Sequence, residues 1–253
     1  MTSHVLLWEM TREQIRGFAP TATAVFPTAA VEQHGPHMAI ATDTLAVTEI
    51  CRRAAEIASK QTPVTVAPPL AFGSSHHHRP YSALSLSQDT FKQVVFEIAE
   101  SLVLSGFKRI AVVNGHGGND ELVRVAAREI SLKYPDVTIA ASSYWTIAHA
   151  ALVAEAKVGD HGQLPGHAGA FETSLVMALR PELVDAASFP KALPLPTTES
   201  QPINRPTLIR AGSKLGDGPG YTDDPSKATA EAGNRYLDIV SRELAAFLVN
   251  LAR

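Results

Sequence analysis

The chain has 253 residues, 45% of them hydrophobic, which is enough for one large core. Because no low-complexity linker divides the chain, we expect a single domain over residues 1–253. Its 22 basic and 25 acidic residues give a formal net charge of -3 and no basic surface for nucleic acid, which favours small-molecule partners. The single cysteine Cys51 excludes an intrachain disulfide, and neither a signal peptide nor a membrane-length apolar run is visible, so we expect a cytoplasmic protein with no membrane contact.

Hydrophobic periodicity predicts strands that alternate with helices. The predicted strands cover about residues 21–31, 64–69, 107–113 and 137–143. The predicted helices cover about residues 11–18, 43–60, 87–105, 121–134 and 173–179. A further helix is predicted after residue 145, and a closing helix is predicted to end at about residue 251. Pro27 interrupts the first strand, and a proline in a strand is typical of an edge or a bulge. The alternation indicates an α/β fold whose mostly parallel sheet is covered on both faces, with functional sites at the carboxyl ends of the strands.

Polar residues follow the first predicted strand. Side chains alternate along an extended chain, so Glu32 and His34 are expected to project to the same side while Gln33 faces away. Asp43 stands where the next helix begins, and its carboxylate can point back toward the strand end. Each residue alone is explained by capping or a salt bridge. Two carboxylates and an imidazole together predict a site for a divalent ion such as zinc, manganese or iron.

A second polar loop, residues 71–81, follows the second predicted strand. It concentrates hydroxyls, three adjacent histidines and a guanidinium, and a solvated surface loop is an equal alternative. Three adjacent histidines are not expected all to face one ion. We select Ser75 and His78 as predicted substrate contacts.

The third predicted strand leads into the glycine-rich loop 114–120, where His116 is a fourth predicted ligand and Asn119 is predicted to cap the next helix. A phosphate cradle is the alternative, but the loop lacks both G-x-G-x-x-G and a P-loop lysine. A histidine packed in a tight turn is the stronger alternative. Trp145, after the fourth strand, is either a core residue or a wall of the substrate pocket.

A third polar loop, residues 159–172, opens the helix that runs to 179. His167 and Glu172 flank the start of that helix, where an imidazole suits proton transfer and a carboxylate suits metal ligation. Helix capping is the alternative role for Glu172. The segment 181–221 is rich in Pro, Gly and Ser, so little regular structure is expected there.

These motifs, in order and spacing, resemble the creatininase (creatinine amidohydrolase) family. The matching segments are Glu32-Gln33-His34-Gly35-Pro36-His37 with Thr42-Asp43, Asn114-Gly115-His116-Gly117-Gly118-Asn119, and His167-Ala168-Gly169 with Glu172-Thr173-Ser174. The resemblance implies a three-layer αβα sandwich, a divalent-metal centre that often holds two ions, hydrolysis of amide-like bonds, and a homo-oligomer, often a hexamer.

The resemblance also implies roles for individual residues. Glu32, Asp43 and His116 would hold one ion, His34 and the bridging Asp43 the other, and His167 matches the catalytic histidine of the family. Creatininase itself has a glutamate where this chain has Gly118, so we hypothesise that Glu172 supplies the second ion's carboxylate. Relatives with the Gly-Gly version include deformylases of pterin or flavin precursors, a peptide-processing enzyme and a hydrolase that opens an oxidised inositol ring.

We therefore predict a metal-dependent hydrolase that uses activated water to cleave an amide-like C–N bond in a small substrate, cyclic substrates included. A first alternative is a ring-opening C–C hydrolase of a cyclic polyol ketone such as an oxidised inositol, for which Ser75, His78 and Arg79 would read hydroxyls. A second is a non-catalytic metal-binding or scaffold protein, whose ion would lack the open position that catalysis needs.

Overall fold

Four parallel strands form the centre of the molecule, in the order β2-β1-β3-β4. The computed structural model describes residues 5–160, 162–190 and 218–253. The strands are β1 (Thr23–Thr28), β2 (Val64–Val66), β3 (Arg109–Asn114) and β4 (Thr138–Ser143). The helices are α1 (Arg12–Phe18), α2 (Thr42–Ala58), α3 (Gln88–Leu104), α4 (Asp120–Lys133), α5 (Tyr144–Ile147), α6 (His149–Ala156), α7 (Ala170–Leu179) and α8 (Ala230–Leu251).

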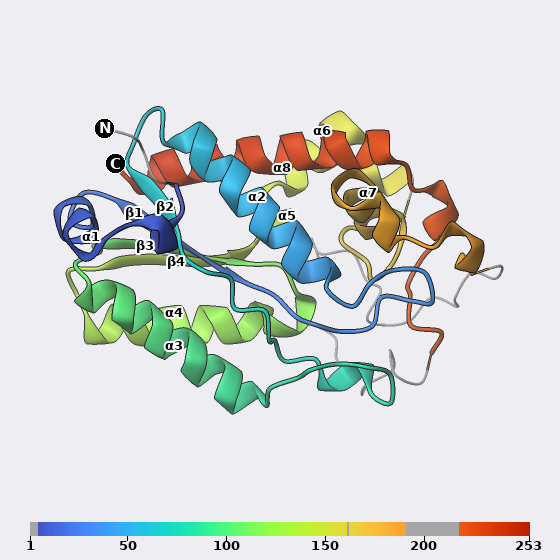
Figure 1. Ribbon diagram of the computed structural model, residues 1–253, viewed down its shortest axis with the longest axis horizontal. Helices are drawn as coiled ribbons and strands as arrows, with labels where there is room; N and C mark the ends of the chain where they lie inside the picture. Colours follow the sequence, from blue (N-terminus) through green and yellow to red (C-terminus); the bar gives the residue numbers. More distant parts are fainter. Residues whose placement is uncertain (1–4, 161, 191–217) are drawn as a thin grey trace.

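Helices cover both faces of the sheet (Figure 1). α3 and α4 lie on one face, and α2 and α5 to α8 lie on the other. Because side chains alternate along a strand, each strand contributes to two cores: Val25 packs with α2 and α8, whereas its neighbour Phe26 packs with α3 and α4. The three-layer αβα fold with a parallel sheet is thereby confirmed.

Pro27 lies in β1, an interior strand of the sheet, but beyond the point where β1 pairs with β2, so that side of the strand is locally an edge. β1 pairs with β3 along its whole length, but its pairing with β2 ends at Val25 and Val66. The backbone of Pro27 faces the side of β2, where its carbonyl accepts a hydrogen bond from Leu70 beyond the end of that strand. Proline has no N–H to donate, but β2 does not pair with β1 at this position, so no hydrogen bond of the sheet is lost.

Two polar residues stand at helix starts. Ser87 accepts a hydrogen bond from the N–H of Thr90 and caps α3. Asn119 precedes α4, but its side chain makes no capping bond, which contradicts the prediction. Its carbonyl accepts from the N–H of Ser74 and its amide donates to the carbonyl of Ala29, so it joins the loops that follow β1 and β2.

Helices α7 and α8 pack closely against each other. Gly233 of α8 lies against the backbone of Ser174 in α7, where an added Cβ would come within 1.8 Å of the Ser174 carbonyl oxygen. Glycine is therefore required for this close approach of the two helices. α7 in turn carries Glu172 in its first turn, so this contact helps to fix the position of that carboxylate.

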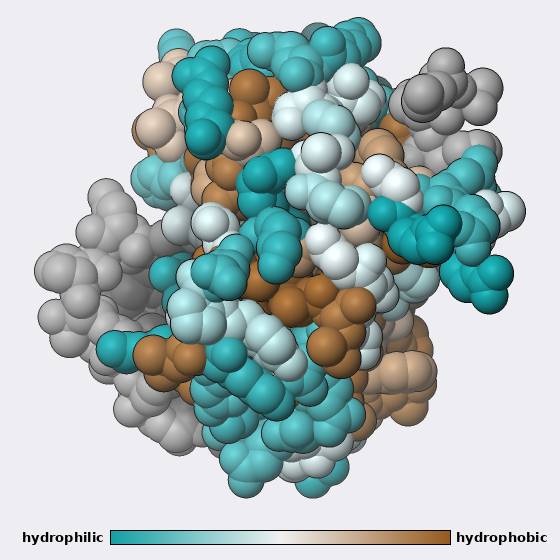
Figure 2. Space-filling model, turned by 90° about the vertical axis from the view of Figure 1, so that its left-hand side faces the viewer, coloured by the Kyte–Doolittle hydropathy of each residue, from teal (hydrophilic) through white to brown (hydrophobic). Residues whose placement is uncertain are grey.

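Figure 2 shows the face at the α1 end, where the strands begin: hydrophilic residues cover most of it and surround a hydrophobic area near its centre. A helix with the length and hydropathy needed to cross a membrane is not found among the described residues. The polar loops described next lie at the other end of the sheet, beyond the carboxyl ends of the strands. A parallel sheet normally places its site at that end.

Candidate metal centre

Five segments far apart in the sequence bring buried charged groups together. They are the loop after β1, the first turn of α2, the turn His76–His78, the loop after β3 and the segment that enters α7. The residues they contribute are Glu32, His34, Asp43, His78, His116, His167 and Glu172, each at most 8% exposed. Three carboxylates and four imidazoles with so little solvent contact require compensating interactions with one another or with an ion.

Glu32 lies at the middle of the group. Its Oε1 is 3.0 Å from Nε2 of His78, 3.1 Å from Nδ1 of His116 and 3.8 Å from Nδ1 of His167. Burial by itself would raise the pKa of Glu32, but the neighbouring His116 and His78 outweigh it and hold that pKa well below its usual value. Oε2 of Glu32 has no hydrogen-bond partner within the described part of the chain. One oxygen of a buried, ionised carboxylate is thus available to a cation.

Asp43 lies between two histidines. Its Oδ1 is 3.1 Å from Nε2 of His34 and its Oδ2 is 3.2 Å from Nδ1 of His116. Burial would lower the pKa of both imidazoles, but the facing carboxylates raise it, to about 10 for His34 and well above its usual value for His116. The carboxylates therefore attract positive charge to this centre. An aspartate that reaches both imidazoles has the placement of a ligand shared by two ions.

Glu172 joins the group from the first turn of α7. Its Oε2 is 3.7 Å from Nε2 of His34 and accepts a hydrogen bond from the N–H of Ala168. Burial, with the charges of Asp43 and Glu32, raises the pKa of Glu172 to about 8 although His34 and the Ala168 N–H oppose the shift. His34, Asp43 and Glu172 place one ligand atom each within 4.8 Å of one another. This is the arrangement expected if Glu172 supplies a carboxylate to the ion at His34.

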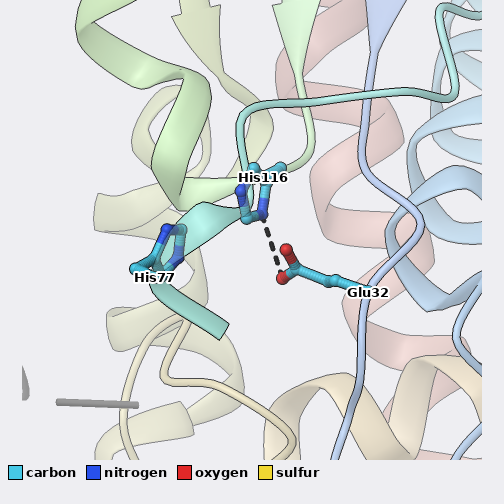
Figure 3. A group of neighbouring side chains, drawn as sticks. All are labelled: Glu32, His77 and His116. Atoms are coloured by element: carbon cyan, nitrogen blue, oxygen red, sulfur yellow. Dashed lines mark ion pairs between the residues drawn. The ribbon is translucent and has the colours of Figure 1, made fainter. Parts of the chain in front are cut away.

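The donor set fits a divalent cation. Two further groups satisfy the same 4.8 Å limit: Glu32 with His34 and His167, and Glu32 with His77 and His116. Figure 3 shows the latter, with both imidazoles on the same side of the Glu32 carboxylate. Mixed nitrogen and oxygen donors suit zinc, manganese or iron, and the number of carboxylates balances more than one positive charge. The predicted ligands Glu32, His34, Asp43, His116 and Glu172 therefore lie together.

Gln33 also lies in the site, contrary to the expectation that it faces away. Its side-chain nitrogen is 2.9 Å from Nδ1 of His78 and 2.9 Å from Nε2 of His167, while its side-chain oxygen accepts from the N–H of Gly35. The alternation rule fails here because β1 ends at Thr28 and residues 32 and 34 make only isolated bridges. The sequence contained one signal for Gln33, its position inside the family motif.

His167 lies in the loop before α7, is 8% exposed and contacts the buried ligand residues. Burial, together with the positive charges of His34 and His78, holds the pKa of His167 well below its usual value. The loop is anchored by the neighbouring segment: Thr222 accepts a hydrogen bond from the His167 N–H, and Asp223 accepts from the N–H of Ala170. Neither anchor was predicted from the sequence; both follow directly after the segment 181–221, which is expected to be irregular.

Of the three residues predicted to contact substrate, two lie beside the candidate metal ligands and one lies in the hydrophobic core. Ser75 is buried with its Oγ 3.3 Å from Nε2 of His116, and His78 is buried against Glu32. Both touch candidate ligands, and their substrate role stays a prediction. Trp145 is 5% exposed and packs in the core with its ring edge-on to Tyr144, as the core alternative expects. Tyr144, which sequence reasoning missed, has a raised pKa because of its burial and the charges of Glu172 and Asp43.

Comparison with known proteins agrees with this geometry. The family model for creatininase, creatinine amidohydrolase, matches residues 8–248. The chain is 31% identical over 231 residues to the mycofactocin precursor peptide peptidase of Mycobacterium ulcerans (strain Agy99), which covers 86% of this chain and 83% of that relative. It is 32% identical over 203 residues to the creatinine amidohydrolase of Pseudomonas putida, covering 73% of this chain and 75% of that relative.

Solved structures give the same result. A crystal structure of creatininase superposes with a TM-score of 0.78 at 26% identity, covering 98% of both chains. A mutant creatininase of the Zn-Zn type gives a TM-score of 0.79 at 25% identity, and a creatininase with Mn gives 0.76 at 25% identity, each again covering 98% of both chains. The family match covers nearly the whole chain and the buried ligand cluster lies where its motifs fall. This chain belongs to the creatininase family.

Proposed function

We propose that this protein is a divalent-metal-dependent hydrolase that cleaves an amide-like C–N bond of a small substrate, cyclic amides included. The observation that carries the proposal is the shared position of Asp43, 3.1 Å from His34 and 3.2 Å from His116, with Glu32 and Glu172 on either side. This arrangement supports two neighbouring ions of zinc, manganese or iron. A divalent ion held there would polarise a carbonyl group and activate water for attack.

The names of the relatives support the proposed type of bond. A peptide peptidase and a creatinine amidohydrolase both carry names that refer to amide-type bonds. Position 118 is glycine in this chain, whereas creatininase has a glutamate there, so we propose a substrate other than creatinine. Peptides, formamides and lactams are the substrate classes to test first. If the protein consumes an oxidised inositol and no amide, it is instead a ring-opening C–C hydrolase.

Gln33 contacts two histidines in this proposal. Its side-chain oxygen is held by the N–H of Gly35, so the amide nitrogen faces Nδ1 of His78 and Nε2 of His167, 2.9 Å from each. A nitrogen that accepts a hydrogen bond carries no proton, so neutral His78 would carry its proton on Nε2, which lies 3.0 Å from Oε1 of Glu32. Nε2 of His167 also lies 3.0 Å from the main-chain oxygen of Gln33, so it has a hydrogen-bond partner with or without a proton.

His167 is placed for proton transfer. Its Nδ1 faces the centre, 3.8 Å from Oε1 of Glu32, and its Nε2–H would donate to the main-chain oxygen of Gln33 at 3.0 Å. The lowered pKa keeps the imidazole neutral at rest, so Nδ1 can take a proton from the attacking water. The imidazolium formed in this way passes the proton from Nδ1 to the leaving amine and becomes neutral again. His167 therefore donates, and is restored, within one fixed environment.

The test combines metal loading with a substrate panel. Metal-free protein is loaded in turn with zinc, manganese and iron, its metal content is measured by mass spectrometry, and each form is assayed on lactams, formamides, short peptides and oxidised inositols. Hydrolysis of an amide by one metal form, and none by the metal-free protein, supports the proposal. A protein that binds none of the three metals is not a metal-dependent hydrolase. We also propose a homo-oligomer, hexamers being frequent in the family, which light scattering measures on the same samples.

A further inference from the structure

His77 lies beside the ligand cluster, in the turn His76–His78 after β2. Its ring is nearly parallel to that of His116, with an interplanar angle of 14° and 5.5 Å between centroids. Figure 3 shows the two rings next to each other, both on the same side of the Glu32 carboxylate. The neighbouring His76 is exposed, so the turn directs one histidine to solvent and the next toward the cluster.

The place of His77 depends on Gly118. A Cβ at position 118 would lie 2.7 Å from Cε1 of His77, 2.6 Å from Nε2 of His116 and 2.3 Å from the carbonyl oxygen of Ser74. Contacts of this length are not tolerated, so any side chain at position 118 would displace the turn that carries His77. The glycine that separates this chain from creatininase is therefore what lets an imidazole lie beside His116.

The atoms of this group suit a cation. Glu32, His77 and His116 each place one ligand atom within 4.8 Å of the other two, and Oε2 of Glu32 has no hydrogen-bond partner within the described part of the chain. None of the segments that match the family motifs includes His77. We propose that His77 is a third protein ligand of the ion held by Glu32 and His116, an inference that rests on the proposed metal-dependent function.

This ligand makes the two ion positions unequal. With Asp43 shared, since its Oδ2 is 3.2 Å from Nδ1 of His116, the first ion would have four protein ligands: Glu32, His77, His116 and Asp43. The second ion would have His34, Asp43 and Glu172, which would leave the open position that a catalytic ion requires. The ring of His167 lies 4.5 Å from that of His34. The first ion would therefore be the tightly held one, and the second the one exposed to substrate.

Competition between the protein and a coloured chelator tests this assignment. The affinities of both ions are measured with zinc and with cobalt, and the visible spectrum of the cobalt form reports the ligands around each ion. The variants are His77→Ala and the size-conserving His77→Gln, with His76→Ala as the matched control in the same turn. Circular dichroism of each metal-free variant checks that the chain is folded, and activity is not needed for the readout.

We expect both His77 variants to weaken one of the two ions by at least about 10-fold and to change its cobalt spectrum, since removal of even an outer-shell partner costs 10–100-fold. His76→Ala should match the wild type. Wild-type affinity for both ions in the folded His77 variants would overturn the assignment of His77 and leave the proposed function intact. A wild-type protein that binds no divalent ion would overturn both.

Discussion

The side-chain nitrogen of Gln33 lies 2.9 Å from Nε2 of His167, and this contact decides which nitrogen of His167 faces the candidate metal centre. Because Nε2 is engaged by Gln33, Nδ1 is the atom left toward Glu32. The same amide contacts His78, so one residue orients two imidazoles at once.

Replacing Gln33 by glutamate tests that role with little change in size. A carboxylate accepts but cannot donate, so both histidines would have to carry a proton on the nitrogen that faces position 33. The added negative charge favours the imidazolium form of His167, which cannot take a proton from water, so we expect kcat to fall by roughly 10²-fold, the lower end for general acid–base catalysis. Nitrogen NMR of the histidine rings should report the changed protonation of both rings. Gln93→Glu, on the exposed face of α3, is the control, and unchanged ring shifts in Gln33→Glu would contradict the assignment.

His167→Ala separates proton transfer from metal binding. His167 is not in the proposed ligand set, and its Nδ1 is 3.8 Å from Oε1 of Glu32, so we expect the bound metal to remain while kcat falls by about 10²–10⁴-fold, the usual contribution of a general acid or base. Metal content and turnover are measured on the same preparation. Turnover equal to that of the wild type would rule out the proposed role.

Asp43→Ala is expected to release metal, because Asp43 faces both His34 and His116. The loss of affinity should exceed the roughly 10–100-fold that follows removal of an outer-shell partner. Mass spectrometry after dialysis gives the metal content, and the exposed Asp136→Ala is the control. Full occupancy in Asp43→Ala would remove this residue from the ligand set.

Gly233→Ala tests the packing of α7 on α8. The new methyl group would meet the carbonyl oxygen of Ser174 at 1.8 Å, so we expect the free energy of unfolding to fall by about 1–3 kcal/mol, the usual cost of overpacking. Gly17→Ala in α1 is the matched control, because nothing lies within 4 Å of its added Cβ. That substitution should stabilise α1 by roughly 0.5–1 kcal/mol. Denaturant unfolding measures both, and equal effects of the two substitutions would contradict the contact.

His37 should make the metal-free protein sensitive to acid. Burial, with the positive charge of His34, lowers the pKa of His37 to about 4. As the pH falls from about 6.5, the pKa of an unfolded histidine, the unfolded chain gains a proton that the folded chain does not bind, so stability falls until about pH 4. His37→Gln removes this contribution and should lose stability less steeply over that interval. Thermal unfolding at several pH values measures the slopes, and a variant slope as steep as that of the wild type would refute the prediction.

The sequence by itself determined the layered fold and most of the ligand set. Runs such as residues 110–113 are apolar without a break, as a strand covered on both faces must be, and polar residues follow each of them. Since the carboxyl ends of parallel strands meet at one edge, the sequence alone predicts that Glu32 and His116 lie together.

Only the tertiary structure decided the rest. Side-chain alternation applies inside a regular strand, and β1 ends four residues before Glu32, so the direction of Gln33 could not be read from its position. His77 and His78 are adjacent and chemically identical, and their different neighbours depend on the space that Gly118 leaves open. Glu172 reaches His34 because α7 packs on α8 through Gly233. Local sequence sets local conformation, whereas contacts between distant segments depend on how the layers pack.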